Sequence, residues 1–202
     1  MLRRMNAEDV PTVAAIHFSS WSPSEISVKL GPKFLELFYA SIAGAPDAFT
    51  YLFEQDGKII AYSSGFLRYQ DFNRRLVRTR WMKFSRILLS RVIARAVTVT
   101  DICNLACDSR KLRKLRYPHV HWGAAALPNE YKGTSLGREA FNRTVHAVFR
   151  DLQQAGCPGC WGPCDSNNHA MEKWLKNLGF EKVDQVDFRG RSIMIYELTF
   201  TR

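Results

Sequence analysis

A short stretch of the chain places small, flexible residues and hydroxyl groups just before a predicted helix. Gly133, Thr134, Ser135 and Gly137 lie within residues 133–138, and the apolar residues that follow recur at helical spacing. Small residues let an anion approach the backbone, and the free N–H groups in the first turn of a helix point towards it. The same residues are also common in plain turns and helix caps. Taken alone, the stretch predicts either a phosphate-binding loop or an ordinary turn.

Five cysteines form a second group that could do chemistry. Cys157, Cys160 and Cys164 lie close together in the sequence, and Cys103 and Cys107 precede them. Four of these thiolates could bind a zinc ion, or the residues could be small buried side chains of a strand. The chain opens without an apolar signal region. We therefore expect a cytoplasmic protein with reduced thiols and no disulfide framework.

The charge of the chain is strongly positive and unevenly placed. The 202 residues predict a single domain, residues 1–202, because this length can bury a substantial core. Much of the net charge of +10 comes from residues 68–116, where Arg and Lys far outnumber the three acidic residues. The segment is either a solvated helix face or a surface that docks on an anionic membrane. We expect no nucleic-acid partner, because no DNA-reading motif accompanies the charge.

Hydrophobic periodicity predicts the elements that must position these groups. The predicted helices are 7–21, 24–44, 80–97, 135–156 and 167–180; the predicted strands are 2–5, 118–127, 157–164, 181–188 and 192–200, with a hairpin at 49–69 about the Gln-Asp-Gly turn 55–57. This order predicts an α/β fold with one central sheet and helices on both of its faces.

The order of predicted helices and strands and the sequence of two segments resemble the acyl-CoA N-acyltransferase superfamily, the GNAT fold. The resemblance extends over nearly the whole chain. The segments are LPNEYKGTSLGREAF, 127–141, and NNHAMEKWLKNLGF, 167–180. The family motif Gln/Arg-x-x-Gly-x-Gly/Ala falls on residues 132–137, with Lys132 in place of Gln or Arg and Ser135 in place of the middle Gly. The resemblance implies a mixed, mostly antiparallel, twisted sheet.

The same resemblance implies which residues bind acetyl-CoA as co-substrate. Main-chain amides of residues 133–138 would bind the pyrophosphate, and Lys132 and Arg138 would add charge-assisted contacts. The strand before the loop would pair with the pantetheine arm, with the amide of Ala125 near the acyl carbonyl. The implied CoA-binding set is Ala125, Ala126, Leu127, Lys132, Gly133, Thr134, Ser135, Leu136, Gly137, Arg138 and Asn168.

The resemblance also suggests catalytic residues. Some members carry a base eleven residues before the loop motif, and that count reaches His121, which could instead be a hydrogen-bonded strand residue. Leu175 occupies the position where many members have a Tyr that protonates the leaving thiolate. Asn168 could hydrogen-bond the sulfur, and Cys164, Ser166 or water could replace the Tyr. Because the family places 157–164 in the strand beside the acyl group, we expect its cysteines to be strand residues and no metal to bind.

The family's acceptor pocket is built from the first two helices, the segment before the fourth strand, and the last hairpin. Here the basic insert at about residues 70–117 resembles the helical insert of GNAT members found beside genes for sugar and surface-polysaccharide synthesis. We therefore expect acetyl transfer from acetyl-CoA directly to a primary amine of a small molecule, such as an aminosugar or a nucleotide-linked aminosugar. A non-catalytic acyl-CoA sensor or interaction module is the alternative, and peripheral membrane contact through the insert and a homodimer are left open.

Overall fold

The computed structural model describes residues 1–98, 101, 114–188 and 191–200. Cys103 and Cys107 lie outside these ranges, as does much of the second half of the basic insert. The described elements are β1 (Leu2–Arg4), the 3-10 turn η1 (Ala7–Asp9), α1 (Val10–Ser20), α2 (Ile26–Leu30), α3 (Pro32–Ala43), β2 (Ala48–Gln55), β3 (Lys58–Phe66), α4 (Tyr69–Ile93), β4 (His121–Ala126), the 3-10 turn η3 (Asn129–Tyr131), α6 (Ser135–Gln154), β5 (Gly159–Asp165), α7 (His169–Asn177), β6 (Glu181–Phe188) and β7 (Arg191–Thr199).

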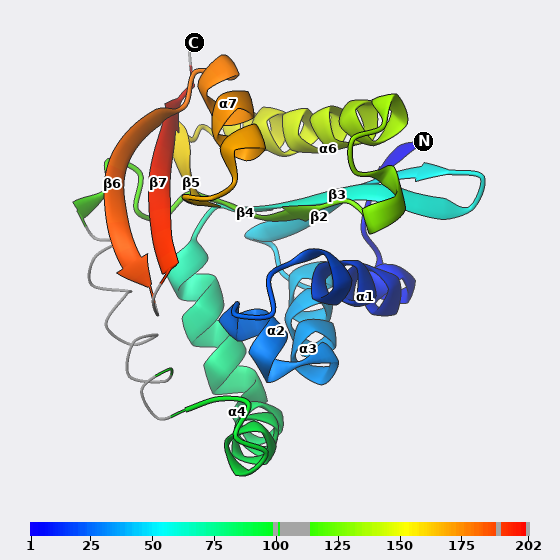
Figure 1. The fold of residues 1–202 in the computed structure, drawn as a ribbon, viewed down its shortest axis with the longest axis vertical. Helices are drawn as coiled ribbons and strands as arrows, with labels where there is room; N and C mark the ends of the chain where they lie inside the picture. The colour runs from blue at the N-terminus through cyan, green and yellow to red at the C-terminus, as the bar shows by residue number, and fades with distance from the viewer. Residues whose placement is uncertain (99–100, 102–113, 189–190, 201–202) are drawn as a thin grey trace.

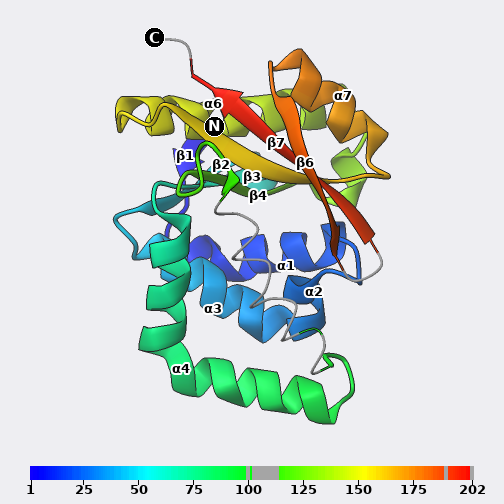
Figure 2. The same cartoon turned by 90° about the vertical axis from the view of Figure 1, so that its left-hand side faces the viewer.

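The strands form one sheet in the order β1-β2-β3-β4-β5-β7-β6. All neighbouring strands are antiparallel except β4 and β5, which are parallel. Helices α6 and α7 cover one face, and α1, α3 and the first half of α4 lie on the other (Figure 1, Figure 2). The predicted α/β fold, with a mixed and mostly antiparallel sheet between helices, is confirmed.

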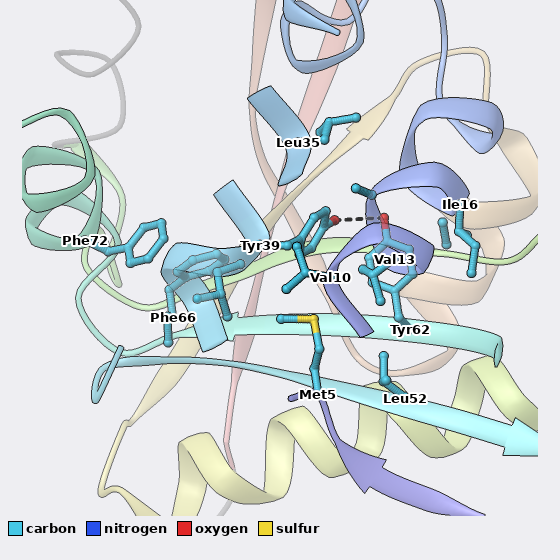
Figure 3. Packing of buried hydrophobic residues seen from close by; sticks show 14 of the residues in the cluster. Met5, Val10, Val13, Ile16, Leu35, Tyr39, Leu52, Tyr62, Phe66 and Phe72 are labelled. Carbon is cyan, nitrogen blue, oxygen red and sulfur yellow. Dashed lines mark hydrogen bonds between the residues drawn. The ribbon is translucent and has the colours of Figure 1, made fainter. Parts of the chain in front are cut away.

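Each face of the sheet has its own hydrophobic core. Beneath α1 and α3, Leu35, Tyr39, Leu52, Tyr62 and Phe66 pack together with almost no exposed surface, and Figure 3 shows this cluster around the Tyr39–Tyr62 hydrogen bond. The second core lies between the sheet and α6 and α7, and its buried members include Trp122, Val145, Leu152, Cys160, Cys164, Leu175 and Tyr196. Alternate side chains of β4 and β5 therefore point towards different faces of the sheet, so neighbouring residues of one strand lie on opposite sides of it.

Two helices differ most from their predicted bounds. The helix predicted at 24–44 is two helices, because Gly31 adopts a φ of +87° and Pro32 begins α3. The helix predicted at 80–97 begins earlier, at Tyr69, and ends at Ile93. Arg80 has non-helical backbone angles inside α4, so the helix is kinked there. Among the described residues, no helix combines the length and the apolar character needed to span a bilayer.

Candidate functional site

The two parallel strands β4 and β5 meet at one end and then separate. His121 lies opposite Trp161 in the pairing, and the Trp161 N–H donates to the Val120 oxygen at 3.1 Å. Within the described chain no further register pair joins β4 to β5, although β4 continues to Ala126. On its other edge β4 stays paired with β3 as far as Ala126 opposite Tyr62. The edge of β4 that faces β5 is therefore open beyond the first pair, and an extended ligand can pair with it.

The loop between β4 and α6 is shaped by Thr134 and Gly137. Thr134 is the N-cap of α6: its hydroxyl accepts a hydrogen bond from the Gly137 N–H at 2.9 Å and donates one to the Tyr131 oxygen at 2.8 Å. A Cβ atom at position 137 would lie 2.1 Å from that same Tyr131 oxygen. Only glycine fits where the loop folds so closely against the first turn of the helix.

Not all of the predicted amides of residues 133–138 are free to bind an anion. The amides of Thr134, Gly137 and Arg138 already donate within the loop and the first helical turn. The amides of Gly133, Ser135 and Leu136 make no hydrogen bond to another described residue, and the first turn of α6 contains no acidic residue. The electrostatics at this helix end therefore suit a phosphate group, and three amides rather than six can bind it.

The side chains predicted to assist the loop point in different directions. Lys132 reaches α1, where its Nζ donates to the Ser20 oxygen at 3.3 Å. Arg138 is exposed and, with Ser135, lines an open groove of about 660 Å³ that runs along α6 to Arg150. Arg138 can therefore contact an anion at the loop directly, whereas Lys132 would first have to leave Ser20.

The three residues predicted to pair with the thioester arm, two in β4 and one just after it, divide between the two faces of the sheet. Ala125 and Leu127 pack with the core under α6 and α7, and Ala126 packs with the core under α1 and α3. The Ser20 hydroxyl donates to the Leu127 oxygen at 2.7 Å, so the end of this strand is held by α1. These positions follow the β5-facing edge of β4, where the thioester arm is expected.

His121 is enclosed by aromatic rings at the point where β4 and β5 separate. Its ring stacks on Trp161 with centroids 4.0 Å apart and lies 4.3 Å from Tyr69, and its Nδ1 donates to the Trp161 oxygen at 3.2 Å. This bond leaves Nε2 as the nitrogen with a lone pair. Burial lowers the pKa of His121 to about 3, so the ring is neutral at neutral pH and a weak proton acceptor. Its role as base stays a prediction.

Cys164 and Asn168 lie together at the other end of β5. The Cys164 sulfur is buried and lies 3.9 Å from the Asn168 main-chain oxygen. Burial raises the pKa of Cys164 to about 11, and the nearby charges of Asp165 and Glu172 add to this, so the thiol keeps its proton at neutral pH. The Asn168 side chain caps α7, because its Oδ1 accepts from the Met171 N–H at 3.1 Å. Its amide nitrogen makes no hydrogen bond within the described chain.

The structure places these predicted catalytic residues on two faces of the sheet. Cys164 belongs to the core under α6 and α7, whereas His121 stacks among Phe66, Tyr69 and Trp161 on the face that carries α4. They could act on one substrate only if it passed through the opening between β4 and β5. Leu175, at the position of the family tyrosine, is fully buried in the Cys164 core.

Two buried polar groups beside this opening were not predicted from the sequence. The Trp161 Nε1 and the Tyr196 hydroxyl are both buried and make no well-formed hydrogen bond in the described chain, although the Glu172 carboxylate of α7 lies close enough to the Tyr196 hydroxyl to interact with it. Tyr196 lies opposite Gly162 in the β5–β7 pairing, in the same core as Cys164. Its pKa is raised to about 12 by burial first and then by the charge of Glu172 on α7. Strand alternation gives the face of each residue, but only the assembled sheet shows that Trp161 Nε1 finds no acceptor and that the Tyr196 hydroxyl lies beside Glu172.

A hydrogen-bonded chain of neutral groups on the opposite face was also missed. His17 contacts the Tyr39 hydroxyl through Nδ1 at 2.7 Å and the Ser27 hydroxyl through Nε2 at 3.1 Å, and Tyr39 donates to Tyr62 at 3.0 Å. Because Tyr39 uses its proton towards Tyr62, Nδ1 of His17 is the donor in the first bond. Burial lowers the pKa of His17 to about 3. The chain joins α1, α2 and α3 beneath β3, in the region where the resemblance places the acceptor.

The cysteines in β5 and just before it are free thiols. Cys157, Cys160 and Cys164 form no disulfide with one another, and Cys160 and Cys164 are buried in the core beneath α6. In the part of the chain that the structure describes, no three His, Cys, Asp or Glu side chains are grouped so that they could hold a metal ion.

Comparison with known proteins identifies the architecture. No family model and no curated protein sequence matches the chain. The ribosomal-protein-S18-alanine N-acetyltransferase from Escherichia coli matches in structure with a TM-score of 0.57 and 13% sequence identity, covering 100% of this chain and 94% of that protein. The PaiA N-acetyltransferase from Thermoplasma acidophilum, solved in complex with coenzyme A, matches with a TM-score of 0.58 and 13% identity over 99% and 98% of the two chains.

A third similar structure is a protein from Desulfovibrio desulfuricans described as an acetyltransferase of the GNAT family. It has a TM-score of 0.59 and 13% sequence identity, with 98% of each chain covered. Matches at this identity that span both chains almost completely establish a shared fold. The chain has the fold of the GNAT N-acetyltransferases.

Proposed function

We propose that the protein is an N-acetyltransferase that moves an acetyl group from acetyl-CoA directly to a primary amine of a small molecule. The observation that carries this proposal is the coincidence of two features at the same end of β4. The strand separates from β5 beyond His121, and the loop that follows it presents the unbonded amides of Gly133, Ser135 and Leu136. One feature suits an extended thioester arm, and the other suits its diphosphate.

Acetyl-CoA would extend from the loop before α6 along the open edge of β4. The three free amides and the exposed Arg138 side chain would bind the diphosphate, and the open edge of β4 would pair with the pantetheine arm. The amide of Ala125 would then hydrogen-bond the acyl carbonyl, as the likeness to the GNAT fold suggests. Such a bond stabilises the negative charge that develops on that oxygen during attack.

Proton transfer at this site is limited by the burial of its titratable groups. With a pKa of about 3, His121 would orient the attacking amine through Nε2 more readily than it would take the amine's proton. A departing thiolate with a pKa of about 8.5 would receive a proton uphill from Cys164, whose pKa is about 11. We therefore infer that CoA leaves as a thiolate with the Asn168 amide close to the sulfur, that the proton lost by the amine passes to solvent, and that the thiolate takes up a proton from bulk solvent.

The acceptor is proposed as a primary amine that enters from the face of α1, α2 and α4. The buried His17, Tyr39 and Tyr62 there are neutral, because burial lowers the pKa of His17 to about 3 and raises the pKa of Tyr39 and Tyr62. The buried carboxylates of Asp9 and Asp101 on that side pair with Arg3 and Lys29, and the insert supplies many further cations. An acceptor that carries phosphates, such as a nucleotide-linked aminosugar, would fit this balance.

The proposal is tested by measuring binding and turnover separately. Titration calorimetry with acetyl-CoA and with CoA should show saturable binding and mutual competition, and thiol release should follow when primary amines are added. Absence of binding by the folded protein would overturn the proposal. Binding without thiol release across a broad amine panel would favour an acyl-CoA sensor, a function that the leucine at position 175 also suits.

A further inference from the structure

The outer half of α4, residues 81–93, carries an apolar ridge that faces away from the rest of the protein. Met82, Leu89 and Ile93 have 59%, 61% and 74% of their surface exposed. Their spacing of seven and four residues aligns them along one side of the helix. We call these three residues the outer ridge. Single exposed apolar residues are ordinary on protein surfaces, but an aligned set on one helix marks an interaction surface.

The opposite side of the same segment is already packed. The Phe84 ring meets the Phe34 ring of α3 edge-on, with centroids 6.1 Å apart, and Arg91 donates through Nε to the Leu30 oxygen of α2 at 3.1 Å. These contacts attach the outer half of α4 to the helical layer and set the direction of the outer ridge. Figure 2 shows this part of α4 beyond α3, at the end of the molecule farthest from the sheet.

Basic residues on and just before the outer half of α4 have no ionic partner among the described residues. Lys83 and Arg86 lie on that segment, Arg78 and Arg80 lie at or just before its kink, and all four are exposed. Nearer the sheet the pattern is different, because Arg74 pairs with Asp71 and Arg75 pairs with Asp47. Arg86 lies four residues after Met82 and three before Leu89, within the ridge itself. Its aliphatic stem can lie along apolar surface while the guanidinium reaches an anion.

We propose that the outer ridge docks the protein on an anionic lipid surface. Apolar side chains on such a helix enter the boundary between headgroups and acyl chains, and neighbouring Lys and Arg residues bind the lipid phosphates. The described residues supply both parts, and the helix lies at an extremity where a flat surface can reach it. This inference is independent of the acetyltransferase proposal, because it uses none of the residues at the opening between β4 and β5.

Charge argues against the two other occupants of such a surface. A second copy in a symmetric dimer would place the four cations of one chain near the four of the other, which like-charge repulsion disfavours. A nucleic acid would satisfy the cations through its phosphates but would leave Met82, Leu89 and Ile93 without an apolar partner. An anionic bilayer satisfies the cations and the apolar ridge together.

The test is co-sedimentation of the full chain with vesicles. Binding is expected with vesicles that contain phosphatidylglycerol and not with pure phosphatidylcholine, and it should weaken as salt is raised. Trp81, which is 60% exposed at the start of the segment, should shift its fluorescence to the blue on binding. A Trp81→Phe variant should bind while most of that shift is lost.

Two variants distinguish the contribution of the cations to vesicle binding from that of the apolar side chains. Lys83→Gln with Arg86→Gln should weaken binding to anionic vesicles roughly 25-fold, about fivefold for each cation. Met82→Ser, Leu89→Ser and Ile93→Ser together should weaken it by about tenfold or more. The matched controls are Lys58→Gln with Lys173→Gln and Phe18→Ser with Val183→Ser, which change exposed residues on other elements. These controls should bind as the unchanged protein does.

Several outcomes would overturn the proposal. No binding to anionic vesicles, equal binding to neutral ones, or equal losses in the control variants would each do so. A dimer in solution that becomes monomeric when the outer ridge is changed to serine would assign the ridge to a second copy. Thermal melts of every variant establish that the loss of binding is not a loss of folding.

Discussion

The rings of His121 and Trp161 stack 4.0 Å apart at the position where β4 and β5 pair, and His121 Nδ1 donates to the Trp161 main-chain oxygen. One residue pair thus closes one end of the opening through both a ring contact and a backbone contact. Beyond this pair the strands separate towards the loop at residues 133–138. The stacked rings therefore mark the inner limit of the proposed thioester site.

Ser135→Pro is expected to weaken acetyl-CoA binding by about 10-fold to 100-fold, because it deletes one free amide while leaving the helix intact. Ser135 is the first residue of α6, where proline is well tolerated, and Thr134 before it has an extended backbone that proline accepts. Titration calorimetry with acetyl-CoA measures the loss.

The matched control for this change is Ser135→Ala, which removes the hydroxyl and keeps the amide. It should bind acetyl-CoA within a few-fold of the unchanged protein. Equal weakening by both substitutions would mean that the hydroxyl, and not the backbone, binds the donor. Circular dichroism of each variant verifies that α6 is retained.

Folding stability should decrease as the pH is lowered from neutrality, because two histidines are buried in neutral form. His17 and His121 each have a folded pKa of about 3, below the ordinary value of 6.5, so the unfolded chain binds more protons between these values. Unfolding is then favoured as the pH falls, by about 2 kcal/mol for the pair between pH 6.5 and about 5.5. Urea unfolding at a series of pH values measures this slope.

Replacing one of the two histidines identifies the source of that slope. His17→Gln or His121→Gln should each remove about half of the pH dependence, whatever it does to stability at neutral pH. Changing the exposed His146 to Gln should leave the slope unchanged. A slope that survives both core substitutions would contradict the burial of neutral imidazoles.

The pH dependence of turnover should follow the acceptor amine rather than a histidine. An amine with a pKa of about 10 gains free base tenfold per pH unit, and His121 stays neutral throughout this range because its pKa is about 3. We expect kcat/KM for the amine to rise from pH 6 to about pH 8 without a break near 6.5. A plateau above pH 7 would instead indicate a catalytic base of ordinary pKa.

A substitution at His121 should affect turnover more than donor binding. His121→Gln keeps a polar side chain of similar size but misplaces the acceptor atom that orients the amine, so kcat should fall about 10-fold to 100-fold. The acetyl-CoA affinity from calorimetry should change little. Equal loss of turnover and donor affinity would show that His121 only holds the strands together.

The same substitution, Tyr to Phe, should have effects of different size at two buried positions. The Tyr196 hydroxyl makes no well-formed hydrogen bond and has only the Glu172 carboxylate beside it, so Tyr196→Phe should change the free energy of unfolding by less than about 1 kcal/mol. Tyr39 bonds both His17 and Tyr62, so Tyr39→Phe should destabilise by about 1–3 kcal/mol. Thermal and urea unfolding measure both.

Much of the architecture could be predicted from local sequence. The hairpin at residues 49–69, the helix that begins after Thr134, and the alternation of strands and helices all follow from patterns spanning a few residues. The loop motif could be located in the same way, because turn and cap chemistry is read from neighbours in the chain. The bounds of α4 were less predictable, since its kink at Arg80 has no proline or glycine to mark it.

The protonation and the hydrogen bonds of the candidate side chains depended on residues far away in the sequence. His121 is neutral and weakly basic because Phe66, Tyr69 and Trp161 surround it, and these rings come from β3, α4 and β5. Lys132 is turned away from the loop by the end of α1. Desolvation and hydrogen bonding arise from packing between elements, which no local motif encodes.

By itself, then, the sequence determined the order of elements, the small residues at the start of α6 and the concentration of positive charge. Only the tertiary structure decided that β4 and β5 separate after one pair, that His121 and Cys164 lie on different faces, and that an apolar ridge on α4 faces outward. The physical reason is that periodicity sets which residues share a face, whereas contacts between distant elements set what that face meets.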